Sequence, residues 1–171
     1  MLALWKRRHF MEPLRSDCRI SRSDGIDVDR LCEEEMRAWY LNLLRTAPPR
    51  LLAPSNVARD CRATVSAHGV MEVILPEGVV RVLSVQLSGW EREAIVEQCM
   101  ASPTVKLQSN PYGRGGAANP VAVHFPGSEV MRVYSPTIAS GTPIIKVEAA
   151  TDPGPERYVM DEEAIALIGP R

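Results

Sequence analysis

Histidine is scarce in this 171-residue chain, and the few histidines stand far apart. His9, His68 and His124 have no second His or Cys at the spacing that metal ligands need. His68 is predicted to lie in a turn, because it stands in Ala-His-Gly, and His124 to be a partly exposed strand residue. The sequence therefore predicts neither a metal site nor a cofactor built from neighbouring residues.

Cysteines are also few and isolated. The sequence has no C-x-x-C motif, and a secreted disulfide framework usually packs its cysteines more densely into a smaller chain. We therefore expect reduced thiols, mostly buried, in a protein made in the cytoplasm. Cys32 stands on the apolar face of a predicted helix and is interpreted as a core residue rather than a nucleophile. The four positions are Cys18, Cys32, Cys61 and Cys99.

Long apolar runs and a strong excess of one charge are absent. No stretch approaches the roughly 18 apolar residues of a membrane span, and MLALWKRRHF at the start is too short for a secretory signal. The net charge of −1 argues against a general nucleic-acid binder. Residues 1–22 are basic and residues 24–35 acidic, which favours a solvated, partly disordered N-terminus over an arm docked on an acidic surface or nucleic acid.

Catalytic and nucleotide-binding motifs are missing as well. The one glycine-rich loop, Gly113 to Gly116, lacks the G-K-[ST] ending of a phosphate-binding loop and is interpreted as a flexible contact loop. There is no G-x-S-x-G elbow and no catalytic-cysteine signature. The carboxylates at 33–35 and 161–163 reflect the preference of acidic residues for helix N-termini. The sequence thus predicts no catalytic residue, no small-molecule substrate and no enzyme.

What the sequence does contain is one clear helix followed by short strands. Apolar residues recur at three- and four-residue steps over residues 27–46, which predicts an amphipathic helix. Asp24 or Asp27 can cap its start, and Pro48 with Pro49 ends it. The helix is expected to pack on the sheet. The expected division is a basic arm over residues 1–22, disordered or bound to a partner, and one α+β domain over 23–171 with a tail from 150.

Residues 62–149 change to patterns typical of strands. Val79 to Ser88 alternates, which predicts a half-buried strand with one wet face. Residues 64–66 are expected to pair with the run from Val70 as a hairpin, and residues 121–125 with 129–135 around Pro126-Gly127 as a second. Further predictions are a strand at 144–149 and a short helix at 161–168, with 91–98 open between strand and helix. The turns are too short for parallel crossovers, so the class is α+β with an antiparallel short-stranded sheet or sandwich.

Five side chains are the candidate partner contacts. Trp90 follows Gly89 at a strand end, where an aromatic can either cover the core or anchor a partner. The glycine-rich residues 109–120 form a long loop, and loops of this length are often contact surfaces. Tyr112 and Arg114 belong to that loop, and Arg114 can form a salt bridge with a partner. Arg7 and Arg8 belong to the basic arm.

Three segments carry a family resemblance: VILPEGVVRVLSVQLSGWEREAI (73–95), SNPYGRGGAANPVAVHF (109–125) and VMRVYSP (130–136). With them the chain resembles small structural proteins of tailed bacteriophages that infect gut bacteria. The resemblance implies a virion component, of the size of the neck or head–tail connector proteins that form rings below the portal. It implies as partners other copies of the chain in a twelvefold ring, the portal, and neighbouring neck and tail proteins. The basic arm, a departure from the pattern, would reach a neighbouring subunit, the portal or DNA in the channel.

The alternatives differ in what they would need. A tail, baseplate or capsid-decorating component fits the same features. A bacterial ligand-binding or regulatory module needs a concave apolar pocket with a few convergent polar groups. An enzyme needs a site assembled from residues far apart in sequence, with clustered and buried titratable groups.

Overall fold

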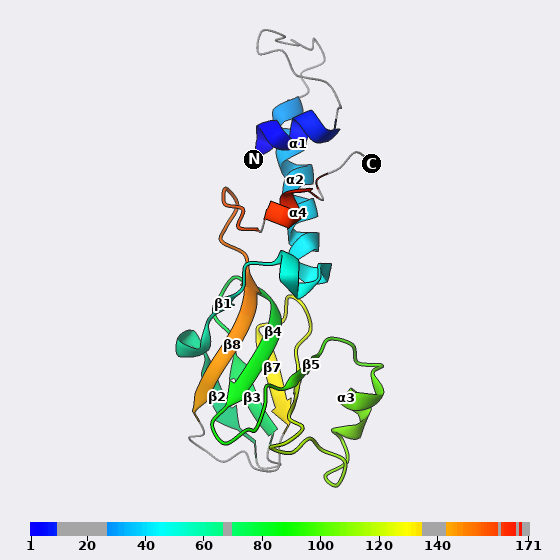
Figure 1. The fold of residues 1–171 in the computed structure, drawn as a ribbon, viewed down its shortest axis with the longest axis vertical. Helices are drawn as coiled ribbons and strands as arrows, with labels where there is room; N and C mark the ends of the chain where they lie inside the picture. The colour runs from blue at the N-terminus through cyan, green and yellow to red at the C-terminus, as the bar shows by residue number, and fades with distance from the viewer. Residues whose placement is uncertain (10–26, 67–69, 135–142, 161, 167, 169–171) are drawn as a thin grey trace. The chain divides into compact units, whose positions relative to one another are not determined.

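Figure 1 shows the computed structural model, which describes residues 1–9, 27–66, 70–134, 143–160, 162–166 and 168. The chain divides into two compact units, and not into an arm and one domain as predicted. Unit 1 consists of Met1–Ala53 with Pro153–Arg171, and unit 2 of Pro54–Asp152. The predicted α+β class is confirmed. Among the described residues, no helix is long and apolar enough to cross a membrane.

Unit 1 is helical. Its longest element is α2, which matches the predicted helix closely. Asp27 caps it by accepting a hydrogen bond from the Arg30 N–H at 3.1 Å. Of the two capping candidates in the sequence, Asp27 is therefore the N-cap. Ala47 after it is extended, as a residue before proline should be. The elements are α1 (Leu2–His9), α2 (Val28–Thr46), the 3-10 turn η1 (Pro49–Leu51) and α4 (Glu162–Ala166).

The start of the predicted arm is helical and packed, which corrects the expectation for residues 2–9. Trp5 of α1 is buried in a small core with Cys32 and Met36 of α2 and with Ile168. Its ring lies 5.4 Å from that of Trp39, centroid to centroid. One large aromatic side chain therefore provides most of the buried apolar surface of α1. A helix buried in this way has no repeating apolar pattern in its sequence. Residues 10–22 of the predicted arm lie outside the described residues.

The C-terminal segment is fastened to α2 by Tyr40. The Tyr40 hydroxyl donates to the Val159 carbonyl at 3.0 Å and accepts from the Val159 N–H at 3.1 Å. The ring of Tyr158 packs edge-on to the Tyr40 ring at 5.1 Å. Because Tyr40 is fully buried, both hydrogen bonds satisfy groups that would otherwise be costly to desolvate. Unit 1 therefore joins the two ends of the sequence.

Unit 2 is a sandwich of two sheets, ordered β1-β8-β4 and β2-β3-β7-β6-β5. The core between them takes Val82, Val85 and Val147 from the first sheet and Met131 and Val133 from the second. The elements are β1 (Ser55–Asn56), the 3-10 turn η2 (Ala58–Asp60), β2 (Arg62–Val65), β3 (Val70–Ile74), β4 (Val79–Leu87), β5 (Ile95–Glu97), α3 (Pro103–Leu107), β6 (Val121–Val123), β7 (Val130–Tyr134) and β8 (Ile144–Thr151).

Both predicted hairpins, β2–β3 and β6–β7, are confirmed as antiparallel pairs, and β8 and α4 form where strand and helix were expected. One pairing differs from the all-antiparallel expectation, because β5 pairs with β6 in parallel. The residues that connect these two strands make the parallel pairing feasible, since a parallel pair needs a long crossover. The sequence predicts only a loop, over residues 109–120, in that crossover.

Strand β4 is buried on both faces, which corrects the prediction of one wet face. Val82 and Val85 are core residues, yet their spacing is three rather than two. A register shift between Val82 and Ser84 accounts for this spacing, because an irregularity changes which face the following residues point to. The alternation predicted for Val79 to Ser88 also fails here, because Leu83 is only half-buried while Ser84 is buried.

His124, expected to be partly exposed, is fully buried directly after β6. Its Nδ1 accepts a hydrogen bond from the Val82 N–H at 3.3 Å, and its Nε2 lies 3.0 Å from the Ser128 carbonyl oxygen. These partners require a neutral ring protonated on Nε2, since Nδ1 faces a donor. Burial lowers the pKa of His124, against a smaller opposite effect of the Ser128 hydrogen bond. The ring thus joins β4 to the β6–β7 turn.

Candidate protein-interaction surface

Residues 98–120, here called the knob, connect β5 to β6 and form the largest excursion from the sandwich of unit 2 (Figure 1). The knob contains α3, in which Pro103 occupies the first turn and the Lys106 N–H donates to the Ser102 carbonyl at 3.1 Å. Proline is well suited to that position because it has no N–H to satisfy. Turns and bends cover residues 100–101, 108–114 and 117–119.

Gln108 holds the knob together from within. It is 3% exposed, and its side-chain Nε2 donates to the Thr104 carbonyl at 2.8 Å. Its Oε1 accepts from the Gly115 N–H at 3.0 Å, and its backbone carbonyl accepts from Arg114 Nε at 3.0 Å. The predicted flexible loop is therefore a hydrogen-bonded unit.

Close packing at Gly115 adds to this order. A Cβ on Gly115 would lie 2.6 Å from the Asn119 carbonyl oxygen and 3.1 Å from Cγ2 of Val121, so no larger residue fits without movement. The knob here approaches β6, whose residue Val121 is buried although it does not belong to the sandwich core. Arg92 donates to the side-chain oxygen of Asn119, and the Glu91 N–H donates to the Ala117 carbonyl at 3.1 Å. These contacts fix the knob to the sandwich.

The ordered knob presents apolar side chains to solvent. Tyr112 is 99% exposed at its tip, Met100 is 65% exposed and Leu107 is 55% exposed. Asn110 shapes the tip, because its side-chain oxygen accepts from the Tyr112 N–H at 3.0 Å. Aromatic side chains are enriched at interface hot spots, and a rigid support reduces the entropy lost on binding. The knob is therefore the strongest candidate contact surface in unit 2.

Unit 1 has a groove of about 750 Å³ between α1, α2 and residues 155–158. Its apolar lining includes Leu2, Met36, Leu41 and Tyr158. The guanidinium of Arg37, a further lining residue, lies 6.0 Å above the Tyr158 ring. The remaining charged residues of the groove are Arg30, Glu33, Glu34 and Glu156.

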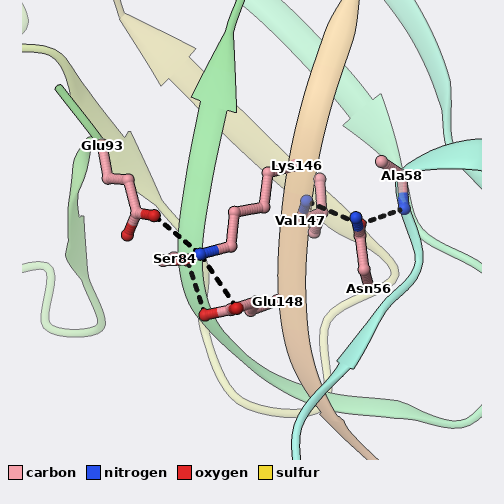
Figure 2. A network of polar contacts seen from close by, with 7 residues as sticks. All are labelled: Asn56, Ala58, Ser84, Glu93, Lys146, Val147 and Glu148. Carbon is pink, nitrogen blue, oxygen red and sulfur yellow. Dashed lines mark hydrogen bonds and ion pairs between the residues drawn. The ribbon is translucent and has the colours of Figure 1, made fainter. Parts of the chain in front are cut away.

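A polar network lies on the three-stranded sheet (Figure 2). Lys146 Nζ is 2.7 Å from the Glu93 carboxylate and 2.9 Å from that of Glu148, which also accepts from the Ser84 hydroxyl at 3.1 Å. The Lys146 hydrogen bond lowers the pKa of Glu93, and the Glu93 hydrogen bond raises the pKa of Lys146. Both groups stay charged near neutral pH, so neither suits proton transfer, and the network is interpreted as a fastening of β4 to β8.

The side chain of Asn56 fastens the short edge strand β1 in the same region (Figure 2). Its Oδ1 accepts from the Val147 N–H and from the Ala58 N–H, both at 3.1 Å. One side chain thus joins β1, β8 and the turn η2. Among the described residues, no three or more His, Cys, Asp or Glu side chains gather as a metal site would require.

The structure separates the predicted contact residues. Tyr112 and Arg114 share the knob, whereas Trp90, for which the sequence allowed two roles, is buried in the core of the sandwich. Arg7 and Arg8 lie in α1, and their side chains are outside what the structure describes. Met100, in a turn, and Leu107, at the end of the five-residue helix α3, were missed, because such short elements have no periodic signature. The groove residues were missed because they come from both ends of the chain.

The cysteines also differ from the expectation that most are buried. Cys32 is a core residue as predicted, whereas Cys61 is half-buried and Cys99 is exposed, and these last two are free thiols. Burial, with a smaller effect of Asp60, raises the pKa of Cys61 to about 11, so its thiol stays protonated. Cys18 and His68 lie outside the described residues.

No protein-family model, curated protein or solved structure matches the chain. Its function is therefore inferred from its residues and their geometry.

Proposed function

We propose that this protein is a virion structural protein of a tailed bacteriophage, a ring-forming neck or head–tail connector subunit that links the portal to the tail. The single observation that carries the proposal is the knob, in which Tyr112 is held 99% exposed by an internally hydrogen-bonded loop. An exposed aromatic on an ordered support suits an assembling subunit, because aromatics are enriched at interface hot spots and preorganisation lowers the entropy lost on binding. The sequence resemblance of residues 73–95, 109–125 and 130–136 supports a virion component, and the size of the chain is that of neck and connector proteins.

The experiment is a native mass measurement of the full chain, alone and mixed with the portal protein encoded beside it. A closed ring formed with or on the portal is the expected result. A chain that stays a monomer or dimer, indifferent to portal and tail proteins, would exclude the connector role. Association with tail, baseplate or capsid proteins alone would move the assignment to those parts of the virion.

The groove in unit 1 favours a second candidate, a small-ligand-binding module. Its volume lies within the range of about 300–1,000 Å³ typical of ligand pockets, and its apolar lining carries a few charged groups. A neutral apolar dye such as Nile red tests this role directly. Saturable binding with one dye per chain, lost in Ala38→Trp but kept in the control Ala53→Trp, would support it. Unsaturable or absent binding would argue against it.

A further inference from the structure

We infer that the edge strand β2 of one copy pairs antiparallel with β2 of a second copy, about a two-fold axis at Thr64. This contact is separate from the proposed connector role, because it uses the edge of the five-stranded sheet and not the knob. Strand β2 is the first strand in the order of that sheet and pairs on one side only, with β3 (Figure 1). Its other side is a row of backbone groups to which a further strand can bind.

The register of β2 and β3 determines which backbone groups of β2 face outward. The Ser66 N–H donates to the Val70 carbonyl at 2.8 Å, so these two residues form a hydrogen-bonded pair. Such pairs alternate along an antiparallel ladder. Thr64 therefore also turns its backbone groups toward β3, whereas Ala63 and Val65 turn theirs outward. Within the part of the chain that the structure describes, no backbone hydrogen bond reaches these outward groups.

The long edge strand of the other sheet, β4, is closed by the chain itself. The Gly127 N–H donates to the Val80 carbonyl and the Ala94 N–H donates to the Val85 carbonyl, both at 2.9 Å. The ring of His124 binds a third backbone group of the same strand. The fold thus covers the long edge of one sheet and leaves that of β2 without a strand.

Strand β2 has few of the features that keep natural edge strands apart. Its register with β3 is continuous, without a bulge, and the strand contains no proline. Ala63 and Val65 stand opposite the core residues Val73 and Met71, so the inner face of β2 is apolar and carries no charge. The one charged residue, Arg62, is at the first position of the strand. Ala63 is exposed, so the middle of the edge is accessible to a partner.

A second copy is the partner that this edge fits, because the edge complements itself. About an axis at Thr64, Ala63 of each copy stands opposite Val65 of the other, so every outward N–H meets an outward carbonyl. On the outer face Thr64 meets Thr64, a favourable cross-strand pair, and Arg62 meets Ser66, so no like charges stand opposite each other. With the axis at Ala63 or Val65 instead, one of the two outward residues would face a position outside β2.

The pairing would join the five-stranded sheets of two copies into one continuous sheet. A two-fold contact is isologous, so it joins two copies and ends there. The knob connects β5 to β6, at the opposite end of the strand order, and therefore stays free for another partner. Because the paired strands are short, we expect a weak dimer, with a Kd of about 10 μM to 1 mM.

The first test exchanges charges at the two-fold axis and measures self-association of the full chain by analytical ultracentrifugation, up to about 1 mM. Thr64→Lys and Thr64→Glu each place like charges opposite each other and should weaken the dimer about fivefold. An equimolar mixture of the two variants should form a mixed dimer at least as strong as the original, because a lysine then faces a glutamate. The control pair Ala53→Lys and Ala53→Glu, at an exposed position of unit 1, should show neither effect.

Three outcomes of this test would overturn the inference. The first is a chain that stays monomeric over the whole concentration range. The second is association that neither Thr64 variant weakens. The third is a mixture of the two variants that associates no more strongly than each variant alone, because recovery in the mixture requires that Thr64 of one copy faces Thr64 of the other.

The second test follows amide hydrogen exchange residue by residue as the protein concentration rises. The amides of Ala63 and Val65 should exchange more slowly at high concentration, whereas that of Thr64, which faces β3, should change less. Ala63→Pro removes one outward donor from each copy and keeps the ladder between β2 and β3, so it should weaken the dimer about tenfold. Exchange of Ala63 and Val65 that does not depend on concentration would refute the pairing.

The two proposals fail separately. Dimers that form through β2 without any binding to portal or tail proteins would retain the strand pairing and reject the connector role. A ring on the portal, formed by a chain that is monomeric alone and unaffected by Thr64→Lys, would retain the connector role and reject the strand pairing.

Discussion

The two units reach stability by different means. Unit 2 buries aliphatic side chains of two sheets against each other, and Val82, Val85, Val133 and Val147 are completely enclosed. Unit 1 also buries leucines of α2 and η1, but its two ends are held to α2 by aromatic residues, Trp5 and the hydrogen-bonded Tyr40. A core of many aliphatic side chains stays folded when one of them is truncated. The small core around the Trp5 indole is expected to be lost when that side chain is removed. The comparison predicts that unit 1 is the more vulnerable of the two.

The largest expected effect is therefore on unit 1. Trp5→Ala should remove about 3–5 kcal/mol, the usual loss for a buried tryptophan, and should expose the amides of α2 to hydrogen exchange. The matched change in unit 2, Met131→Ala, should cost about 2–5 kcal/mol and expose the strands instead. Exchange measured by mass spectrometry distinguishes the units. Equal loss of protection in both units after either change would contradict the comparison.

The next effect concerns the order of the knob within unit 2. Gln108→Ala leaves Gly115 N–H and the Thr104 carbonyl without their partner, which should cost about 1–3 kcal/mol of local stability. Limited proteolysis should then cut residues 109–119 faster while the sandwich stays folded. Gln108→Glu keeps an acceptor for Gly115 and loses the donor to Thr104. Its cleavage rate should therefore lie between those of the original protein and of Gln108→Ala. Unchanged cleavage in Gln108→Ala would show that the turns order themselves.

Acid should weaken unit 2 through His124. Because the folded-state pKa is lowered, the unfolded chain takes up the proton first as pH falls below about 6.5, its ordinary value. Stability is then complete above that pH and falls by at most about 1.4 kcal/mol per pH unit below it, until the folded pKa is reached. In His124→Asn, whose side-chain oxygen can still accept from Val82, this slope should be missing. Urea unfolding at several pH values measures the difference, and equal slopes would refute it.

The smallest effect should come from the cross-strand ion pair of Arg132 and Glu72, at 3.1 Å with both side chains about half exposed. Arg132→Ala should lower the free energy of unfolding by less than about 1 kcal/mol, because water and salt screen such pairs. The difference from the original protein should vanish in 1 M salt, where the screening length is about 3 Å. A loss that persists at high salt would mean that the arginine stem stabilises the sheet by packing.

Several elements could be predicted from the sequence because their signals are local. The apolar spacing of α2 with Asp27 at its start, the turn at Pro126-Gly127 and the pairing of β2 with β3 depend on residues only a few positions apart. Tyr112 and Arg114 could be identified as contact candidates because turn-forming residues surround them. The absence of recognised catalytic motifs could also be read from the sequence, because such motifs consist of neighbouring residues.

The tertiary structure alone decided what depends on residues far apart. Val82 and His124 are 42 positions apart, and Tyr40 and Val159 are 119 apart, so no local pattern could reveal either pair. The burial of Trp5, the parallel β5–β6 pairing and the groove lined from both ends of the chain share this origin. Periodicity fixes which face of an element is apolar, but the partner of that face is chosen by packing across the whole unit.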